Sequence, residues 1–120
     1  MKKVFFLKTC TTCNRIIKEL GNLLKDFEFQ EIKSEPLNRQ DLDEMHSRSK
    51  NFESLFSRKA RKYRELNLSE KELKEADYEA LLLEDYTFLK RPVFIIEKEI
   101  FIGNSAKEIE RLKSYLDKSA

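Results

Sequence analysis

The segment Thr9-Cys10-Thr11-Thr12-Cys13 contains both cysteines of the chain. The apolar run Val4-Phe5-Phe6-Leu7 precedes it and predicts a buried strand, whereas apolar residues at helical spacing follow it and predict a helix over about 11–25. A cysteine at the start of a helix lies where unpaired backbone N–H groups and the positive end of the helix dipole stabilise a thiolate. This arrangement predicts that Cys10 is a nucleophile and that Cys13 is its resolving partner or a structural neighbour.

The composition indicates a small protein with no general affinity for nucleic acid or membranes. The chain has 120 residues and a net charge of only +2, so we expect one domain, no direct DNA binding and no membrane association. The apolar runs are far shorter than a membrane span, and the run before Lys8 is too short for a signal peptide. We therefore predict a cytoplasmic monomer, in which a cysteine pair is more often redox-active or metal-binding than structural.

A metal site is the weaker interpretation of the cysteines. Cys10, Cys13 and the single histidine, His46, do not complete a four-ligand zinc site unless a carboxylate or a second chain joins them. No metal site is predicted.

A second strand is indicated by Phe27, Phe29 and Ile32, which we expect to face inward, with Glu28 and Gln30 facing solvent. The alternation slips by one position at Ile32, which predicts the end of the strand or a bulge there.

Two patterns of capping residues predict helices in the middle of the chain. Asn38 with Asp41 predicts the start of one helix, and Ser69-Glu70-Lys71-Glu72 predicts a short helix through about Ala76, after which Asp77 can cap the next. A basic run, 58–64, lies between them. It is either a solvated basic face or a local site for an anion or a partner protein.

The last third of the chain predicts an antiparallel hairpin and a final helix. Two apolar runs, 93–96 and 100–102, lie too close together for any other connection, and Pro92 stands at the head of the first. Ser105-Ala106-Lys107-Glu108 then opens the last helix. The order of elements predicts an α/β fold with a small mixed four-stranded sheet covered by helices on both faces. We expect a single domain over 1–120, with a helical insertion at about 36–88 before the hairpin.

Three features together resemble the ArsC/Spx family of arsenate-reductase-like proteins, which have the thioredoxin fold. They are the Cys-x-x-Cys motif, the long helical insertion, and Lys90-Arg91-Pro92 directly before the apolar strand 93–96. The resemblance implies that Pro92 follows a cis peptide bond and lies against the cysteine loop. Arg91 would then lie beside Cys10, where it can lower the pKa of the thiol and bind an oxyanion.

The resemblance also implies the remaining site residues. Arg58 matches a second anion-binding arginine of the family, with Arg61 as a rival because the alignment there needs a gap. The family's third arginine has no counterpart, since Gly103-Asn104 stand at its place. Thr11 can donate a hydrogen bond to the Cys10 thiolate or only cap the helix.

The function implied by the resemblance is that of a thiol oxidoreductase without a bound cofactor. The Cys10 thiolate would attack an oxyanion or a disulfide, Cys13 would resolve the adduct as an intramolecular disulfide, and glutathione, glutaredoxin or thioredoxin would be the external reductant. The alternative is a redox-switched regulator like Spx, which binds the α subunit of RNA polymerase. A third alternative is a relative that has kept the fold and lost the chemistry.

Overall fold

The computed structural model describes residues 1–119, and within them it contains four strands and five α-helices. In chain order these are β1 (Lys2–Phe6), α1 (Thr11–Leu20), β2 (Glu28–Glu31), α2 (Arg39–Ser49), α3 (Arg61–Glu65), α4 (Glu75–Glu84), β3 (Val93–Ile96), β4 (Glu99–Ile102) and α5 (Ala106–Ser119). Short 3₁₀ turns occupy Gly21–Leu24, Glu53–Leu55, Leu68–Glu70 and Tyr86–Phe88.

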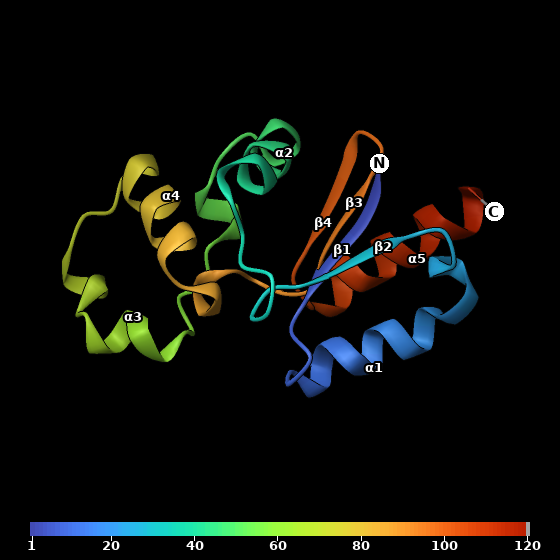
Figure 1. Cartoon of the computed structure of the whole chain (residues 1–120), viewed down its shortest axis with the longest axis horizontal. Helices are drawn as coiled ribbons and strands as arrows, with labels where there is room; N and C mark the ends of the chain where they lie inside the picture. Colours follow the sequence, from blue (N-terminus) through green and yellow to red (C-terminus); the bar gives the residue numbers. More distant parts are fainter. Residues whose placement is uncertain (120) are drawn as a thin grey trace.

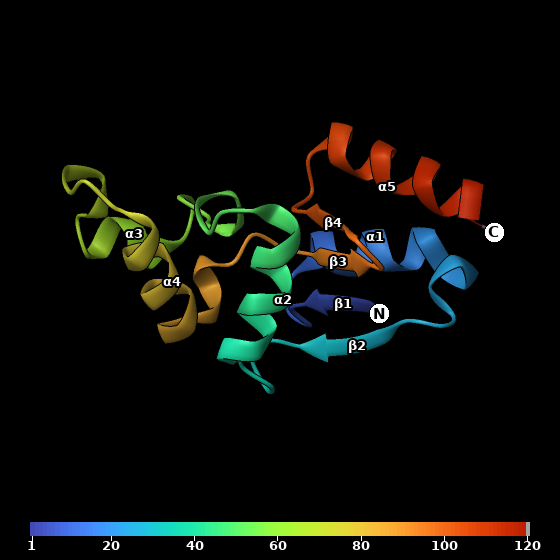
Figure 2. The same cartoon turned by 90° about the horizontal axis from the view of Figure 1, so that it is seen from above.

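The four strands form one mixed sheet in the order β2-β1-β3-β4 (Figure 2). β1 runs parallel to β2 and antiparallel to β3. β3 and β4 form the predicted hairpin, with Val93 opposite Ile102.

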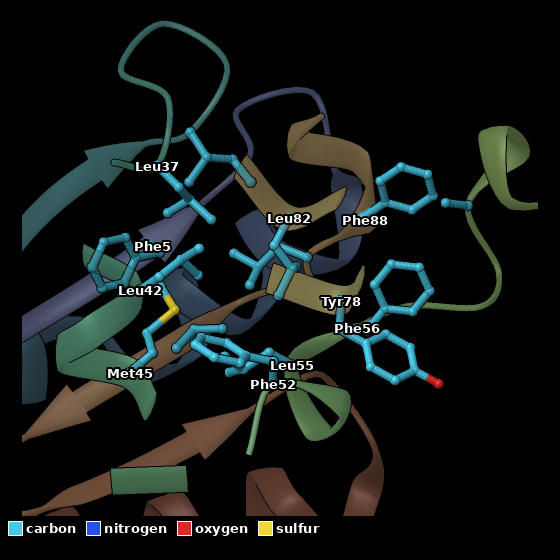
Figure 3. Close-up of a cluster of buried hydrophobic side chains, with 14 of the residues drawn as sticks. Phe5, Leu37, Leu42, Met45, Phe52, Leu55, Phe56, Tyr78, Leu82 and Phe88 are labelled. Atoms are coloured by element: carbon cyan, nitrogen blue, oxygen red, sulfur yellow. The ribbon is translucent and has the colours of Figure 1, made fainter. Parts of the chain in front are cut away.

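Helices cover both faces of the sheet (Figure 1). On one face Val4 and Phe94 pack with Leu112 and other apolar residues of α1 and α5. On the other face Phe5 and Ile95 pack against a larger cluster from α2, α4 and the turns between them (Figure 3). Neighbouring residues of β1 and β3 thus point to opposite cores, because side chains alternate across a strand.

The predicted facing is wrong at Phe29 and Gln30 of β2, whereas Glu28 is exposed and Phe27 and Ile32 are buried, as predicted. Phe29 is 44% exposed, whereas Gln30 is 3% exposed and lies beside Phe5 in the register of β1 and β2. The Gln30 side-chain amide donates to the Glu35 carbonyl oxygen at 2.9 Å and to Asp41 Oδ2 at 3.1 Å. The polar side chain is buried because the loop and helix that follow supply its partners. The strand ends at Glu31, as the slipped alternation predicted.

The predicted cap of α2 is confirmed. Asn38 Oδ1 accepts from the Asp41 backbone N–H at 2.8 Å, and Asp41 Oδ2 accepts from the Asn38 N–H at 3.1 Å.

The helix predicted from Ser69 to Ala76 is wrong. A 3₁₀ turn covers Leu68–Glu70, and α4 starts only at Glu75. Asp77 does help to cap the helix that carries Tyr78 and Leu82, but from its first turn rather than as the N-cap residue: its carboxylate accepts from the backbone N–H of the N-cap residue Lys74 at 2.8 Å. The start of α4 is selected by burial, because Tyr78 and Leu82 enter the core from this helix.

Candidate active site

Cys10 occupies the N-cap position of α1, between the end of β1 and the first helical turn. Its backbone N–H donates to the Leu7 carbonyl oxygen at 2.9 Å, and its carbonyl oxygen accepts from the Asn14 N–H at 3.1 Å. Thr11 is the first residue of the helix and is exposed, so Cys10 rather than Thr11 holds the cap position. The Cys10 side chain is partly buried at this position. It therefore lies at the positive end of the helix dipole with its sulfur open to chemistry.

Two side chains fix the backbone of the cysteine loop. The Asn14 side-chain amide donates to the Lys8 carbonyl oxygen at 2.8 Å. Glu31, at the end of β2, accepts from the Lys8 N–H at 3.0 Å and from the Ser34 N–H at 2.8 Å. Neither residue was predicted from the sequence, because no local pattern marks a side chain of Asn14 or Glu31 as a partner of the Lys8 backbone.

Arg91 and Pro92 approach the cysteine loop from the start of β3. The peptide bond between them is cis, as predicted. Arg91 Nη1 donates to the carbonyl oxygens of Leu89 at 3.1 Å and Thr87 at 3.3 Å. In the described part of the chain, Arg91 forms no ion pair and its buried Nε has no hydrogen-bond partner. Arg91 therefore brings an uncompensated positive charge to Cys10.

The two cysteines have opposite pKa shifts. Partial burial opposes ionisation of Cys10, but the backbone N–H and thiol of Cys13 and the charge of Arg91 outweigh it and lower the pKa of Cys10. Burial raises the pKa of Cys13 to about 12, and the neighbouring Cys10 adds to the shift. Cys10 is thus the more acidic thiol of the pair, and Cys13 is a buried thiol that holds its proton more strongly.

A pocket of about 490 Å³ opens at Cys10. Its charged lining is entirely basic among the described residues and consists of Arg58, Lys59, Lys90 and Arg91. The rest of the wall is apolar or small and polar: Phe56, Leu89, Ile102, Ser57, Gly103, Asn104 and Ser105. Lys59 lies in the basic run 58–64, for which an anion site was one of the two interpretations, whereas Lys90 was not predicted as a site residue although it adjoins Arg91.

Backbone pairing between distant segments brings Arg58 and Arg91 to the same pocket. The Ser57 N–H donates to the Phe88 carbonyl oxygen at 2.7 Å, and the Lys90 N–H donates to the Leu55 carbonyl oxygen at 2.8 Å. Arg61, the rival of Arg58, is exposed at the start of α3 and does not line the pocket.

Three other predicted site residues, Pro92, Cys13 and Thr11, do not line the pocket. Pro92 is buried behind Arg91, and its carbonyl oxygen accepts from the Gly103 N–H at 2.9 Å. Gly103 and Asn104 occupy the place where the family's third arginine was sought, and Asn104 Nδ2 donates to the Arg91 carbonyl oxygen at 3.1 Å.

Residues 1–119 contain no group of three or more His, Cys, Asp or Glu side chains that could hold a metal ion. No helix in that range is long and apolar enough to span a membrane.

One family model and several curated proteins match most of this chain. The model of the ArsC family matches residues 5–112. The global transcriptional regulator Spx of Streptococcus pyogenes serotype M1 is 27% identical over 115 residues, which cover 95% of this chain and 86% of that protein. The Spx of Enterococcus faecalis is 29% identical over 112 residues, covering 92% of this chain and 85% of that protein.

Solved structures agree with the fold. An ArsC-family-related protein of Bacteroides fragilis superposes with a TM-score of 0.76 at 23% identity, over 92% of this chain and 96% of that one. The arsenate reductase of Vibrio cholerae gives a TM-score of 0.76 at 14% identity, over 94% and 95% of the two chains. The predicted thioredoxin-like architecture is thereby confirmed.

Proposed function

Because the chain belongs to the ArsC family, we propose that it is a thiol oxidoreductase with Cys10 as nucleophile and Cys13 as resolving cysteine. One observation carries the proposal: at the start of α1, beside Arg91, the pKa of Cys10 is lowered while burial raises that of Cys13 to about 12. The thiol with the lower pKa forms the attacking thiolate more readily, and the buried neighbouring thiol reacts in the second step.

The reaction with a disulfide balances within the two cysteines. The Cys10 thiolate attacks one sulfur of the substrate, the substrate S–S bond breaks, and the first substrate thiolate leaves. Cys13 then gives up its proton to that thiolate or to solvent and attacks Cys10 Sγ, which releases the second substrate thiolate. The Cys10–Cys13 dithiol is oxidised by two electrons and the substrate disulfide is reduced. Glutathione, or a thioredoxin or glutaredoxin, would return the pair to the dithiol.

The loss of the Cys10 charge favours the second step. The neighbouring Cys10 contributes to the raised pKa of Cys13. Once Cys10 is part of a mixed disulfide, this contribution disappears, so Cys13 ionises more easily at the moment when it must attack.

The pocket favours anionic substrates. Arg58 and Arg91 offer forked donors to a carboxylate or an oxyanion, and Lys59 and Lys90 add charge. With Gly103 and Asn104 in place of a third arginine, a small oxyanion would be held more weakly than an anionic disulfide that also fills the apolar wall.

The test is a stoichiometric exchange between the reduced protein and oxidised glutathione, followed by intact-mass measurement. The wild type should lose the mass of two hydrogens, Cys13→Ser should stop as a mixed disulfide with one glutathione, and Cys10→Ser should not react. Exchange by Cys10→Ser at the wild-type rate would overturn the proposal. An arsenate-dependent assay run beside it decides whether oxyanions are substrates as well.

A redox-switched transcription regulator is the second candidate, and the match to Spx proteins over nearly the whole chain favours it. The same Cys10–Cys13 disulfide would then alter a surface that binds the RNA polymerase α subunit. Binding of the purified α subunit to the dithiol and disulfide forms tests this candidate. Equal or absent binding in both forms would remove it.

A further inference from the structure

Arg58 lines the pocket with its guanidinium held at one end by two other side chains. Arg58 Nη2 donates to Glu53 Oε2 at 2.8 Å and to the Tyr78 hydroxyl oxygen at 3.0 Å. The guanidinium carbon also lies 5.9 Å from the centre of the Tyr78 ring. These contacts restrict the side chain, although about half of its surface is exposed.

Both anchors depend on α4. Tyr78 belongs to this helix, is 6% exposed, and packs its ring against Phe56 with the ring centres 4.9 Å apart. Figure 3 shows its hydroxyl oxygen pointing out of the apolar cluster. Glu53 begins a 3₁₀ turn, and the Glu75 carboxylate of α4 accepts from the backbone N–H groups of Phe52 at 2.7 Å and Glu53 at 3.1 Å.

The anchors leave most of the guanidinium available. Arginine has five N–H donors, and the two on Nη2 are the ones that bind Glu53 and Tyr78. Among residues 1–119, neither Nε nor Nη1 of Arg58 has a hydrogen-bond partner. The remaining donors are enough to fork onto a carboxylate.

We infer that Tyr78 is a positioning residue for anionic substrates: its hydroxyl, with Glu53, fixes Arg58 so that the free donors of the guanidinium serve the pocket at Cys10. This inference rests on the proposed function, because it concerns the substrate that reacts with Cys10. An arginine already held in place loses less side-chain entropy when an anion binds.

Tyr78→Phe is the cleanest variant for the test. It removes the hydroxyl acceptor but keeps the ring that packs against Phe56. Glu53→Gln is less suitable because it also removes a negative charge from the neighbourhood of the pocket. Tyr63→Phe is the matched control, since Tyr63 also packs against Phe56, with ring centres 6.0 Å apart, and is not among the hydrogen-bond partners of Arg58 within the described residues.

The assay compares two aromatic disulfides that differ in charge. One is 5,5′-dithiobis(2-nitrobenzoate), which carries two carboxylates, and the other is neutral 2,2′-dithiodipyridine. The measurements are made in Cys13→Ser, so that only Cys10 reacts. In each case the probe S–S bond breaks, a Cys10–aryl disulfide forms, and one coloured arylthiolate or thiopyridone is released.

Tyr78→Phe should slow the anionic probe about two- to fivefold, the effect of one partly exposed hydrogen bond, and leave the neutral probe unchanged. In an Arg58→Gln background Tyr78→Phe should have no further effect, because the tyrosine acts through the arginine. Tyr63→Phe should leave both rates unchanged.

Equal slowing of both probes by Tyr78→Phe, or an effect that persists without Arg58, would overturn the inference, as would an unchanged rate. The neutral probe separates this failure from that of the proposed function. If Cys10 reacts with the neutral probe no faster than an ordinary thiol at neutral pH, the reactive cysteine itself is absent.

Discussion

At the scale of single residues, the site depends on the charge of Arg91 beside a sulfur at a helix start. The lining of the pocket contributes no carboxylate among the described residues, so no negatively charged side chain in the wall competes with Cys10 for this charge. The lowered pKa of Cys10 affects its reactivity at neutral pH. The raised pKa of Cys13 affects the stability of the reduced protein at alkaline pH.

Replacing Arg91 with Gln should make Cys10 less reactive at neutral pH. The guanidinium lowers the pKa of Cys10, so its removal raises that pKa and moves the midpoint of the alkylation rate to higher pH. Iodoacetamide alkylation followed across pH should show a several-fold slower rate near pH 7. Arg15→Gln removes an exposed charge from the same helix and should leave the midpoint in place. If the Arg91 variant keeps the wild-type midpoint, Arg91 does not activate the thiol.

Cys13 should destabilise the reduced protein at alkaline pH. Its pKa is raised from 9.0 to about 12 on folding, so above the lower value the unfolded chain is ionised while the folded chain keeps the proton. The unfolded state then binds fewer protons, and the free energy of unfolding falls as pH rises.

Urea unfolding under reducing conditions measures this effect. Relative to Cys13→Ser, the wild type should lose about 1 kcal/mol of unfolding free energy between pH 8 and pH 10. Parallel pH profiles for the two proteins would contradict a buried, protonated Cys13.

Some of these site residues can be predicted from the sequence and others cannot. The spacing of Cys10 and Cys13 before a helical pattern predicts that they belong to a site. The position of Arg91 before Pro92 predicts the same for the arginine. Lys90 and Lys59 could not be distinguished from the other exposed lysines, because their role depends on where the two segments meet in space.

At the scale of elements, the capping box of α2 combines a pattern that is visible in the local sequence with a contact to a residue of β2. Asp41 accepts from the Asn38 N–H and also from the buried Gln30 side chain of β2. The box was visible in the sequence because its residues are three apart. The inward turn of Gln30 was not, since its partners lie beyond the end of its own strand and outweigh the ordinary preference of Phe for the interior.

Asn38→Ala should lower the free energy of unfolding by about 1 kcal/mol, because it leaves the Asp41 N–H without its acceptor. Chemical denaturation measures this. Asn22→Ala is the matched control: Asn22 is exposed and its side chain makes no hydrogen bond within residues 1–119, so its loss should change little. Equal effects of the two substitutions would show that the box does not stabilise α2.

At the scale of the whole molecule, the order of elements predicted the sheet and the helices on its two faces, because short connections and right-handed crossovers leave few alternatives. The order of elements could not predict the pocket. It forms where segment 55–57 pairs with segment 88–90, more than thirty residues away along the chain, and no local pattern encodes that pairing.

The basic pocket predicts a salt effect on the reaction of Cys10. Between about 0.01 M and 1 M salt the Debye length falls from about 30 Å to about 3 Å, so attraction of a dianionic disulfide should be largely screened. Stopped-flow measurement should show several-fold slower reaction of the anionic probe at high salt and little change for the neutral one. A common salt dependence for both probes would mean that the lysines and arginines of the wall do not attract the substrate.

Because segment 55–57 pairs with segment 88–90, the pocket is built from two separate parts of the chain. Cys10 comes from the start of α1 and Arg91 from the segment just before β3, whereas residues 56–59 come from the helical segment between β2 and β3. The selectivity of the proposed reaction can therefore change by substitution at three consecutive positions while the two cysteines stay as they are. A library confined to Ser57, Arg58 and Lys59, with the fully buried Phe56 kept for the core, is the compact place from which to redirect this scaffold toward disulfides of different size and charge.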